Sequence, residues 1–235
     1  EEGPDMKWRS AYLASAIVTA AAMLSPASAQ QTDWTKRVTM SAMGGHVLGN
    51  PLAKNRLVEY VSYTCNHCAD FEVSSHTPLK TGFIAKGQVS AEVRNYVRDP
   101  LDFTAAVLAR CGGRTKFFGN HNALMASQDT WLKTAQSISP DVQKSWFQGE
   151  INDRLKKIAS DIGLYGIMAK RGISKAEANS CLADKNAQDQ ILAMTKYGSD
   201  TVKITGTPSF TINDKLLDGV HSWPALRPKL AALPQ

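Results

Sequence analysis

The hydrophobic pattern begins with a strand, a helix and a second strand. Residues 56–63 are β-branched and aromatic and are apolar on both alternating faces except at Glu59, which is typical of a strand buried inside a sheet. Residues 88–97 alternate between apolar and polar side chains and predict another strand. A helix is expected between them over residues 66–86, and Pro78 should kink or split it. This order predicts a parallel pair of strands joined by a right-handed crossover.

The pattern then changes to a long helical stretch and returns to strands near the end. Residues 101–198 are rich in Ala, Leu, Lys and Gln and are punctuated by Gly, Pro and Ser, which predicts several helices. Residues 209–213 predict a strand, residues 214–215 a turn, and residues 216–219 a short partner strand. A last helix is expected over residues 222–232. The chain is therefore predicted to be α/β, with a βαβ unit and a ββα unit separated by about a hundred helical residues.

The first thirty residues resemble an export signal. A short basic start at residues 6–9 precedes an uncharged apolar run at residues 11–24, and small residues follow at 26–30. This is the order that a signal peptidase substrate shows, and the apolar run is too short to span a bilayer comfortably as an anchor. We expect a signal peptide over residues 6–29, with residues 1–5 lying upstream of the native start. The mature protein is then expected in the periplasm.

Composition and charge limit the classes of molecule that the protein is expected to bind. The chain of 235 residues is 43% hydrophobic and 20% charged, as in an ordinary soluble domain. Without residues 1–29 it holds 25 basic and 18 acidic residues, a formal charge of +7. These basic residues are scattered and are not interleaved with stacking aromatics, as they are in single-strand binders. We therefore expect a solvated basic surface and no nucleic-acid partner.

Two of the four cysteines form a motif with a chemical role. Cys65 and Cys68 lie where the predicted buried strand passes into a helix. Free backbone N–H groups and the positive end of the helix dipole stabilise a thiolate at that place. We expect Cys65 to be the more exposed, reactive sulfur and Cys68 to resolve the mixed disulfide. His67 between them should favour the thiolate further and make the disulfide a stronger oxidant.

Two other interpretations of this motif remain open. Cys65 and Cys68 could form a small structural disulfide, although such bridges rarely close so short a loop at a strand–helix junction. Alternatively, Cys65, His67 and Cys68 could bind copper or zinc. A closed zinc site needs four ligands, and the chain has no second cluster of this type.

The segment RLVEYVSYTCNHCADF at residues 56–71 strongly resembles the active-site segment of DsbA-like periplasmic thiol:disulfide oxidoreductases. A second match is Gly-Thr-Pro-Ser-Phe at residues 206–210, which is similar to the loop with a cis-proline in that family. The resemblance implies a thioredoxin fold in two halves, residues 30–100 and 199–235, with the inserted all-helical subdomain of residues 101–198 between them.

The resemblance also implies roles for residues outside the motif. Thr207 and Pro208 would lie beside the cysteine pair, and the backbone of Thr207 would pair with an extended substrate peptide. Glu59 would be a buried carboxylate that relays the proton of Cys68. A single charge in a strand otherwise buried is unfavourable without such a role, although a solvent-facing glutamate is the alternative.

The function implied is the introduction of disulfides into exported proteins that have free cysteines. The chain would need no cofactor, and a quinone-linked membrane protein similar to DsbB would reoxidise it. An isomerase or reductase with the same residues is the alternative. Isomerases of this fold are usually dimers through a separate N-terminal domain, and only about 25 residues of the expected mature chain, residues 30–55, precede the first core strand here. We therefore expect a monomeric oxidase.

The remaining cysteines and the histidines outside the motif receive structural interpretations. Cys111 and Cys181 both fall in the predicted helical insertion, and an oxidising compartment favours a bridge between them. Two separate buried thiols are the alternative. The other histidines are expected to be isolated surface or core side chains; they are His46, His76, His121 and His221.

Overall fold

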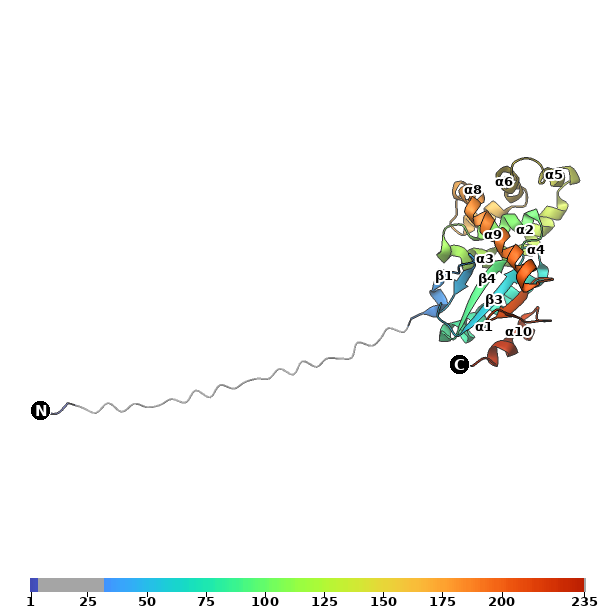
Figure 1. Cartoon of the computed structure of the whole chain (residues 1–235). Helices are drawn as coiled ribbons and strands as arrows, with labels where there is room; N and C mark the ends of the chain where they lie inside the picture. The colour runs from blue at the N-terminus through green and yellow to red at the C-terminus, as the bar shows by residue number, and fades with distance from the viewer. Residues whose placement is uncertain (4–31, 235) are drawn as a thin grey trace. The chain divides into compact units, whose positions relative to one another are not determined.

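The computed structural model describes residues 1–3 and 32–234, and Figure 1 shows the course of the chain. It divides into two units, Glu1–Thr32 and Asp33–Gln235, and the second contains all the helices and strands discussed below. The predicted signal peptide at residues 6–29 lies outside the described residues. No helix within the described part of the chain is long and apolar enough to cross a membrane.

One mixed sheet forms the centre of the second unit (Figure 1). Its strand order is β1-β2-β4-β3-β5-β6, and the strands within residues 32–234 are β1 Val38–Met40, β2 His46–Leu48, β3 Asn55–Val61, β4 Val89–Asn95, β5 Ser209–Ile212 and β6 Lys215–Leu216. β3 and β4 run parallel, with Leu57 opposite Ala91, which confirms the predicted pairing. The other neighbouring strands are antiparallel. A thioredoxin-type α/β fold is therefore confirmed.

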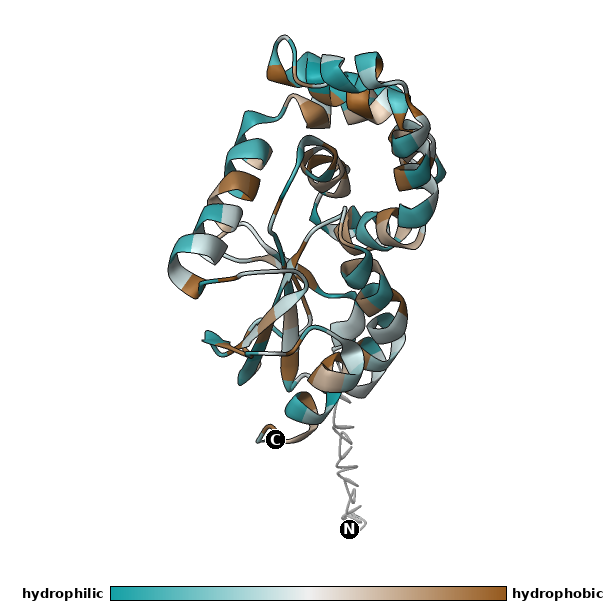
Figure 2. Cartoon of the chain, turned by 90° about the vertical axis from the view of Figure 1, so that its right-hand side faces the viewer, coloured by the Kyte–Doolittle hydropathy of each residue, from teal (hydrophilic) through white to brown (hydrophobic). Residues whose placement is uncertain are grey.

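The central strand β3 is buried on both faces, as its apolar pattern predicted. Leu57 packs in one cluster with Phe71 of the following helix, whereas Val58 and Tyr60 pack on the other face with Ile204. In Figure 2 the central strands carry apolar, brown positions, and polar, teal positions are prominent on the outer helices. The period of two along a strand therefore directs alternate side chains into two separate layers of the core.

Helix α1, Asn66–Gly82, follows β3 and carries the cysteine motif at its start. Pro78 was predicted to kink or split this helix. A split is wrong, because α1 continues through Pro78 to Gly82, and a 3₁₀ turn at Ile84–Lys86 completes the segment; a kink stays a prediction. A proline removes one backbone donor, the partner of the carbonyl four residues earlier. That carbonyl belongs to Ser74, which is exposed, so water can satisfy it.

The C-terminal hairpin turns one residue earlier than predicted. β5 ends at Ile212, and Asn213 and Asp214 form the turn with φ angles of 49° and 66°. Asn and Asp tolerate this left-handed conformation better than other non-glycine residues. β6 therefore begins at Lys215, which the sequence had placed in the turn.

The segment between β4 and β5 is helical, as predicted, and we call helices α2 to α9 the helical insertion. Within the described residues it contains α2 Pro100–Ala109, α3 Phe117–Ala126, α4 Gln128–Ser137, α5 Pro140–Ser145, α6 Ile151–Asp161, α7 Leu164–Lys170, α8 Lys175–Leu182 and α9 Lys185–Tyr197. Helix α2 is buried and contacts α3, α6, α8 and α9. The chain then returns to the sheet and ends in α10, Trp223–Ala231, which contacts α1.

A disulfide joins Cys111 and Cys181, with their Cα atoms 5.6 Å apart. Cys111 follows the C-terminal end of α2, and Cys181 lies in α8. The bridge therefore ties the central helix of the insertion to a helix 70 residues further along the chain.

Replacement of both bridge cysteines by alanine is expected to lower the free energy of unfolding by about 4 kcal/mol, because the bridge restricts the unfolded chain over a long loop. Urea unfolding of the oxidised protein and of the Cys111→Ala, Cys181→Ala variant measures this difference. The helical signal of the folded variant should be unchanged in water. An unchanged unfolding midpoint would contradict the expected contribution of the bridge.

Candidate active site

The two free cysteines lie at the first turn of α1 and differ in their surroundings. Cys65 is the N-cap residue, with extended backbone, and its carbonyl accepts from the N–H groups of Cys68 and Ala69 at 3.1 and 3.3 Å. Its side chain is 5% exposed, whereas Cys68 is fully buried. The sequence interpretation, with Cys65 more exposed than Cys68, agrees with this placement.

The surroundings shift the pKa values of the two thiols in opposite directions. A hydrogen bond from Cys68 is the largest cause that lowers the pKa of Cys65 to about 5; Thr207 and the positive charge of Arg98 act in the same direction. Burial is the main cause that raises the pKa of Cys68 well above its ordinary value. Cys65 is thus a thiolate at neutral pH in the reduced protein, and Cys68 stays a thiol.

A loop with a cis-proline lies against the reactive sulfur. The Thr207–Pro208 peptide bond is cis, and Cys65 Sγ lies 3.1 Å from the carbonyl oxygen of Thr207, to which it can donate only while it is a thiol. His221, which the sequence treated as isolated, donates from Nδ1 to the carbonyl of Pro208 at 2.7 Å. The structure thus brings together two motifs separated by about 140 residues.

His67 occupies a different environment from the one the sequence suggested. It is exposed, and its side chain makes no hydrogen bond to any of the described residues. The lowered pKa of Cys65 is instead caused by Cys68, Thr207 and Arg98, which together outweigh the opposing effect of burial. A contribution of His67 to the reaction stays a prediction.

Glu59 lies in the middle of the sheet, in β3, between Val93 of β4 and Phe210 of β5. It is 7% exposed, and its Oε1 atom has no hydrogen-bond partner among the described residues. Burial is the main cause that raises its pKa well above the ordinary value, with a smaller effect of Glu72. The charge of Glu59 in turn contributes to the raised pKa of Cys68. The solvent-facing alternative for Glu59 is therefore wrong.

Two histidines that the sequence treated as isolated share a carboxylate on α1. His76 Nδ1 lies 3.1 Å and His121 Nε2 lies 3.3 Å from the oxygens of Glu72. The expectation of isolated side chains is wrong here, because the partners of His121 come from segments far away in the chain. Burial raises the pKa of Glu72, but the two histidines outweigh it and bring the pKa to about 2. Tyr63 binds the other nitrogen of His121 at 2.8 Å.

The loop that leads into α1 is held by side chains that sequence reasoning missed. Asp102 of α2 accepts from the Ser62 hydroxyl at 2.6 Å and from the Tyr63 N–H at 2.7 Å. Gln128 of α4 donates to the carbonyls of Tyr63 and Cys65, both at 2.8 Å. Both side chains are buried and polar, and neither has a sequence signal that links it to the cysteine motif.

No cluster of three or more His, Cys, Asp or Glu side chains that could hold a metal ion occurs within residues 1–3 and 32–234. The cysteines and the exposed His67 therefore do not converge as ligands in the described structure. This finding gives the metal-binding alternative no support.

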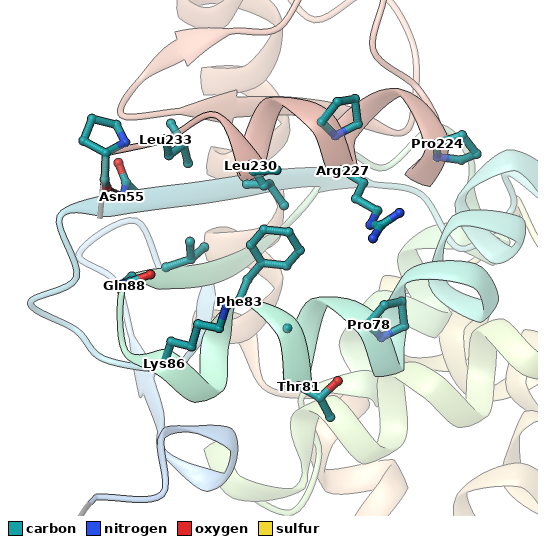
Figure 3. Close-up of a pocket in the computed structure, with 15 residues that line it drawn as sticks. Asn55, Pro78, Thr81, Phe83, Lys86, Gln88, Pro224, Arg227, Leu230 and Leu233 are labelled. Carbon is teal, nitrogen blue, oxygen red and sulfur yellow. Dashed lines mark hydrogen bonds between the residues drawn. The ribbon is translucent and has the colours of Figure 1, made fainter.

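A cleft of about 770 Å³ lies at the other end of α1, between that end and α10 (Figure 3). Phe83, Leu230 and Leu233 line it, with Lys86 and Arg227 at its walls. Since α1 rises by about 1.5 Å per residue, the cleft begins roughly 20 Å along the helix from Cys65. It is therefore separate from the cysteine site.

Comparison with known proteins gives three related findings. A family model described as Thioredoxin matches residues 41–231. The crystal structure of a protein-disulfide isomerase from Novosphingobium aromaticivorans is 41% identical, with a TM-score of 0.77, and the match covers 80% of this chain and 96% of that one. Wolbachia pipientis alpha-DsbA1 is 22% identical, with a TM-score of 0.65 over 83% of this chain and 92% of that one, a likeness of fold.

Curated relatives are longer. A Rickettsia conorii protein named "Putative protein-disulfide oxidoreductase RC0029" is 30% identical over 168 residues, which are 71% of this chain and 52% of the relative. The corresponding Rickettsia bellii protein is 29% identical, over 56% of its length. The chain thus spans about half the length of the curated relatives it matches.

Proposed function

This chain belongs to the thioredoxin family, and from that premise we propose that it is a thiol:disulfide oxidoreductase that introduces disulfides into exported proteins. The observation that carries the proposal is the opposite shift of two neighbouring thiol pKa values, lowered to about 5 at Cys65 and raised at Cys68. A thiolate that is stable in the reduced protein is a good leaving group and makes the disulfide easy to reduce.

The proposed reaction starts from the Cys65–Cys68 disulfide. A substrate thiolate attacks Cys65 Sγ, a substrate–Cys65 disulfide forms, and the Cys65–Cys68 bond breaks, so that Cys68 leaves as a thiolate and takes up a proton. A second substrate thiolate then attacks the substrate sulfur of the mixed disulfide. The substrate gains a disulfide, Cys65 leaves as a thiolate, and the enzyme holds the two electrons.

Thr207 positions the substrate in this proposal. Its carbonyl lies 3.1 Å from Cys65 Sγ, so an extended peptide that pairs with the Thr207 backbone brings its own cysteine next to that sulfur.

Glu59 is proposed to hold and release the proton of Cys68. A neutral carboxyl can donate a proton to the Cys68 thiolate when it leaves, and the carboxylate can take the proton back during reoxidation. Burial raises its pKa, which favours the neutral carboxyl over the carboxylate.

Glu59→Gln is expected to slow opening of the Cys65–Cys68 disulfide by on the order of a hundredfold, since general acid–base catalysis contributes at least that much. Its free energy of unfolding should change little, because glutamine has nearly the same shape and carries no charge at this buried position. Stopped-flow reduction by a dithiol peptide, together with thermal unfolding, tests both parts. A wild-type rate in this variant would show that Glu59 does not relay the proton of Cys68.

An isomerase is the second candidate, because the structure with 41% identity carries that name. The low pKa of Cys65 favours the oxidase, since each pKa unit by which the thiolate is stabilised raises the potential by about 30 mV. The same pair could nevertheless serve isomerisation if the protein is kept reduced.

The decisive experiment compares two reactions of the same protein. The oxidised protein should rapidly oxidise a peptide with two cysteines, and the reduced protein should only slowly rearrange a substrate with wrongly paired disulfides. Rapid rearrangement with slow oxidation would replace the oxidase by the isomerase. Equilibration with glutathione gives the potential in the same series.

The proposal includes a location and partners. We propose export to the periplasm through the segment at residues 6–29, action as a monomer on folding proteins with free cysteines, and reoxidation by a quinone-linked membrane protein similar to DsbB. The reaction written above needs no further cofactor, because all electrons move between sulfur atoms.

A further inference from the structure

The helical insertion is hydrogen-bonded to the active-site loop at the last residue of that loop, Cys65. Gln128 is the first residue of α4 and is 4% exposed. Its side-chain nitrogen donates to the carbonyls of Tyr63 and Cys65, both at 2.8 Å. Because a carbonyl oxygen only accepts, both partners require the NH₂ end of the amide at this position. One side chain thus fixes two alternate residues of the loop.

The Cys65 carbonyl is also the point where α1 begins. It accepts the first helical hydrogen bonds, from the N–H groups of Cys68 and Ala69. Gln128 adds a third donor to the same oxygen. This contact sets the orientation of the peptide unit that carries Cys65, and with it the position of Sγ between Cys68 and the carbonyl of Thr207.

The contact has an electrostatic consequence as well. A peptide carbonyl places partial negative charge beside the Cys65 sulfur, and a donor on that carbonyl offsets part of it. The reduced pair carries a negative thiolate, whereas the disulfide is neutral. A fixed donor at this place therefore stabilises the reduced state more than the oxidised state.

We propose that Gln128 is a positioning residue for the Cys65–Cys68 pair, through which the helical insertion sets how readily the pair is reduced. The inference rests on the proposed function, since it concerns the same redox pair. It assigns the insertion a part in the chemistry, because α4 reaches the backbone of the reactive cysteine directly.

The chain contains a matched control in the same insertion. Gln188 of α9 is 8% exposed, and its side-chain nitrogen donates to the Leu182 carbonyl at 2.7 Å and to Asn152 at 3.0 Å. It is thus a buried glutamine with two acceptors and no side-chain hydrogen bond to the described residues of the cysteine loop. Gln128→Met and Gln188→Met both keep the side-chain length and remove two donated hydrogen bonds.

Two readouts separate positioning from folding. In the reduced protein the thiolate absorbance is titrated with pH, and the redox equilibrium with glutathione is measured by alkylation of Cys65. Gln128→Met should shift the glutathione equilibrium toward the disulfide about three- to tenfold, the range expected for one lost hydrogen bond. The titration midpoint of Cys65 should rise correspondingly, by about half a unit to one unit. Gln188→Met should change neither, although it lowers the unfolding temperature.

Gln128→Glu gives a second measurement if the methionine variant does not fold. Its carboxylate retains the shape but lacks the donors and adds negative charge, so the shift should have the same direction and be larger. Wild-type values in the Gln128 variants, or equal shifts in the Gln188 variant, would overturn the inference. If the wild-type protein lacks a low thiol pKa or does not oxidise a dithiol peptide, the proposed function fails instead.

Discussion

Cys65→Ser is expected to abolish the oxidation of a two-cysteine peptide, leaving the rate of the uncatalysed exchange. A serine hydroxyl cannot form a disulfide, so neither the attack of the substrate nor the departure of Cys65 can occur. The fold should be retained, because serine is nearly isosteric and Cys65 sits at a helix N-cap, where serine is favoured. Peptide oxidation followed by mass spectrometry, with circular dichroism as the check on folding, measures this result.

Cys68→Ser provides the matched variant at the neighbouring position. It keeps the reactive Cys65 but lacks the resolving sulfur, so an activated substrate cysteine should become trapped on Cys65 as a stable mixed disulfide. The adduct would be seen as a mass increase equal to the peptide. Surviving peptide oxidation in Cys65→Ser, or a stable adduct on Cys68 in Cys65→Ser with none on Cys65 in Cys68→Ser, would mean that the roles of the two cysteines are reversed.

The second expected result concerns stability and pH. The folded pKa of Cys65, about 5, lies well below its ordinary value of 9.0. The unfolded reduced protein therefore binds more protons than the folded one between these values, and the free energy of unfolding rises with pH across this window. The slope is at most about 1.4 kcal/mol per pH unit, which gives at most about 5 kcal/mol in total.

The sign of this effect can be tested against a variant without the thiolate. The Cys65–Cys68 pair is reduced by a short pulse of dithiothreitol that is removed before unfolding, and urea unfolding is followed between pH 5 and pH 8 for the wild type and for Cys65→Ser. The free energy of unfolding of the wild type should increase relative to that of the variant as the pH rises. Near pH 5 the two values should approach each other. Above about pH 9 the raised pKa of Cys68 acts in the opposite direction, so the range stops below that value. Parallel curves would contradict the low pKa of Cys65.

The central elements of the fold and the core of the site follow from short-range sequence patterns. The parallel strands β3 and β4 and the helix between them were predictable from periodicity, and so was the place of Cys65 at a helix start. The main cause of its lowered pKa, the hydrogen bond from Cys68, comes from the other cysteine of the same motif. The proximity of Thr207 came from a resemblance to a family, because contact between segments 140 residues apart has no local signal.

The parts that sequence reasoning missed share a physical cause. Their interaction partners lie on other elements, as the partners of Glu72, His121 and Gln128 do. A polar residue in a helical pattern is therefore predicted to be exposed until the packing is known. Pro78 shows the converse error, since a local propensity against helix was overridden by the packing of α1 on the sheet. The turn at Asn213 and Asp214 differed by one residue, the usual uncertainty of an element boundary.

The bridge between Cys111 and Cys181 has a consequence for the biogenesis of the protein. A newly made chain carries four reduced cysteines, and Cys65 and Cys68 precede the others, so the reactive pair is complete while the 70-residue loop is still open. Under the proposed function, closure of that loop is itself a substrate reaction, which an already oxidised copy can perform. The maturation of each new molecule would then depend on the number of mature molecules present, and the first copies in a compartment would mature more slowly than those that follow.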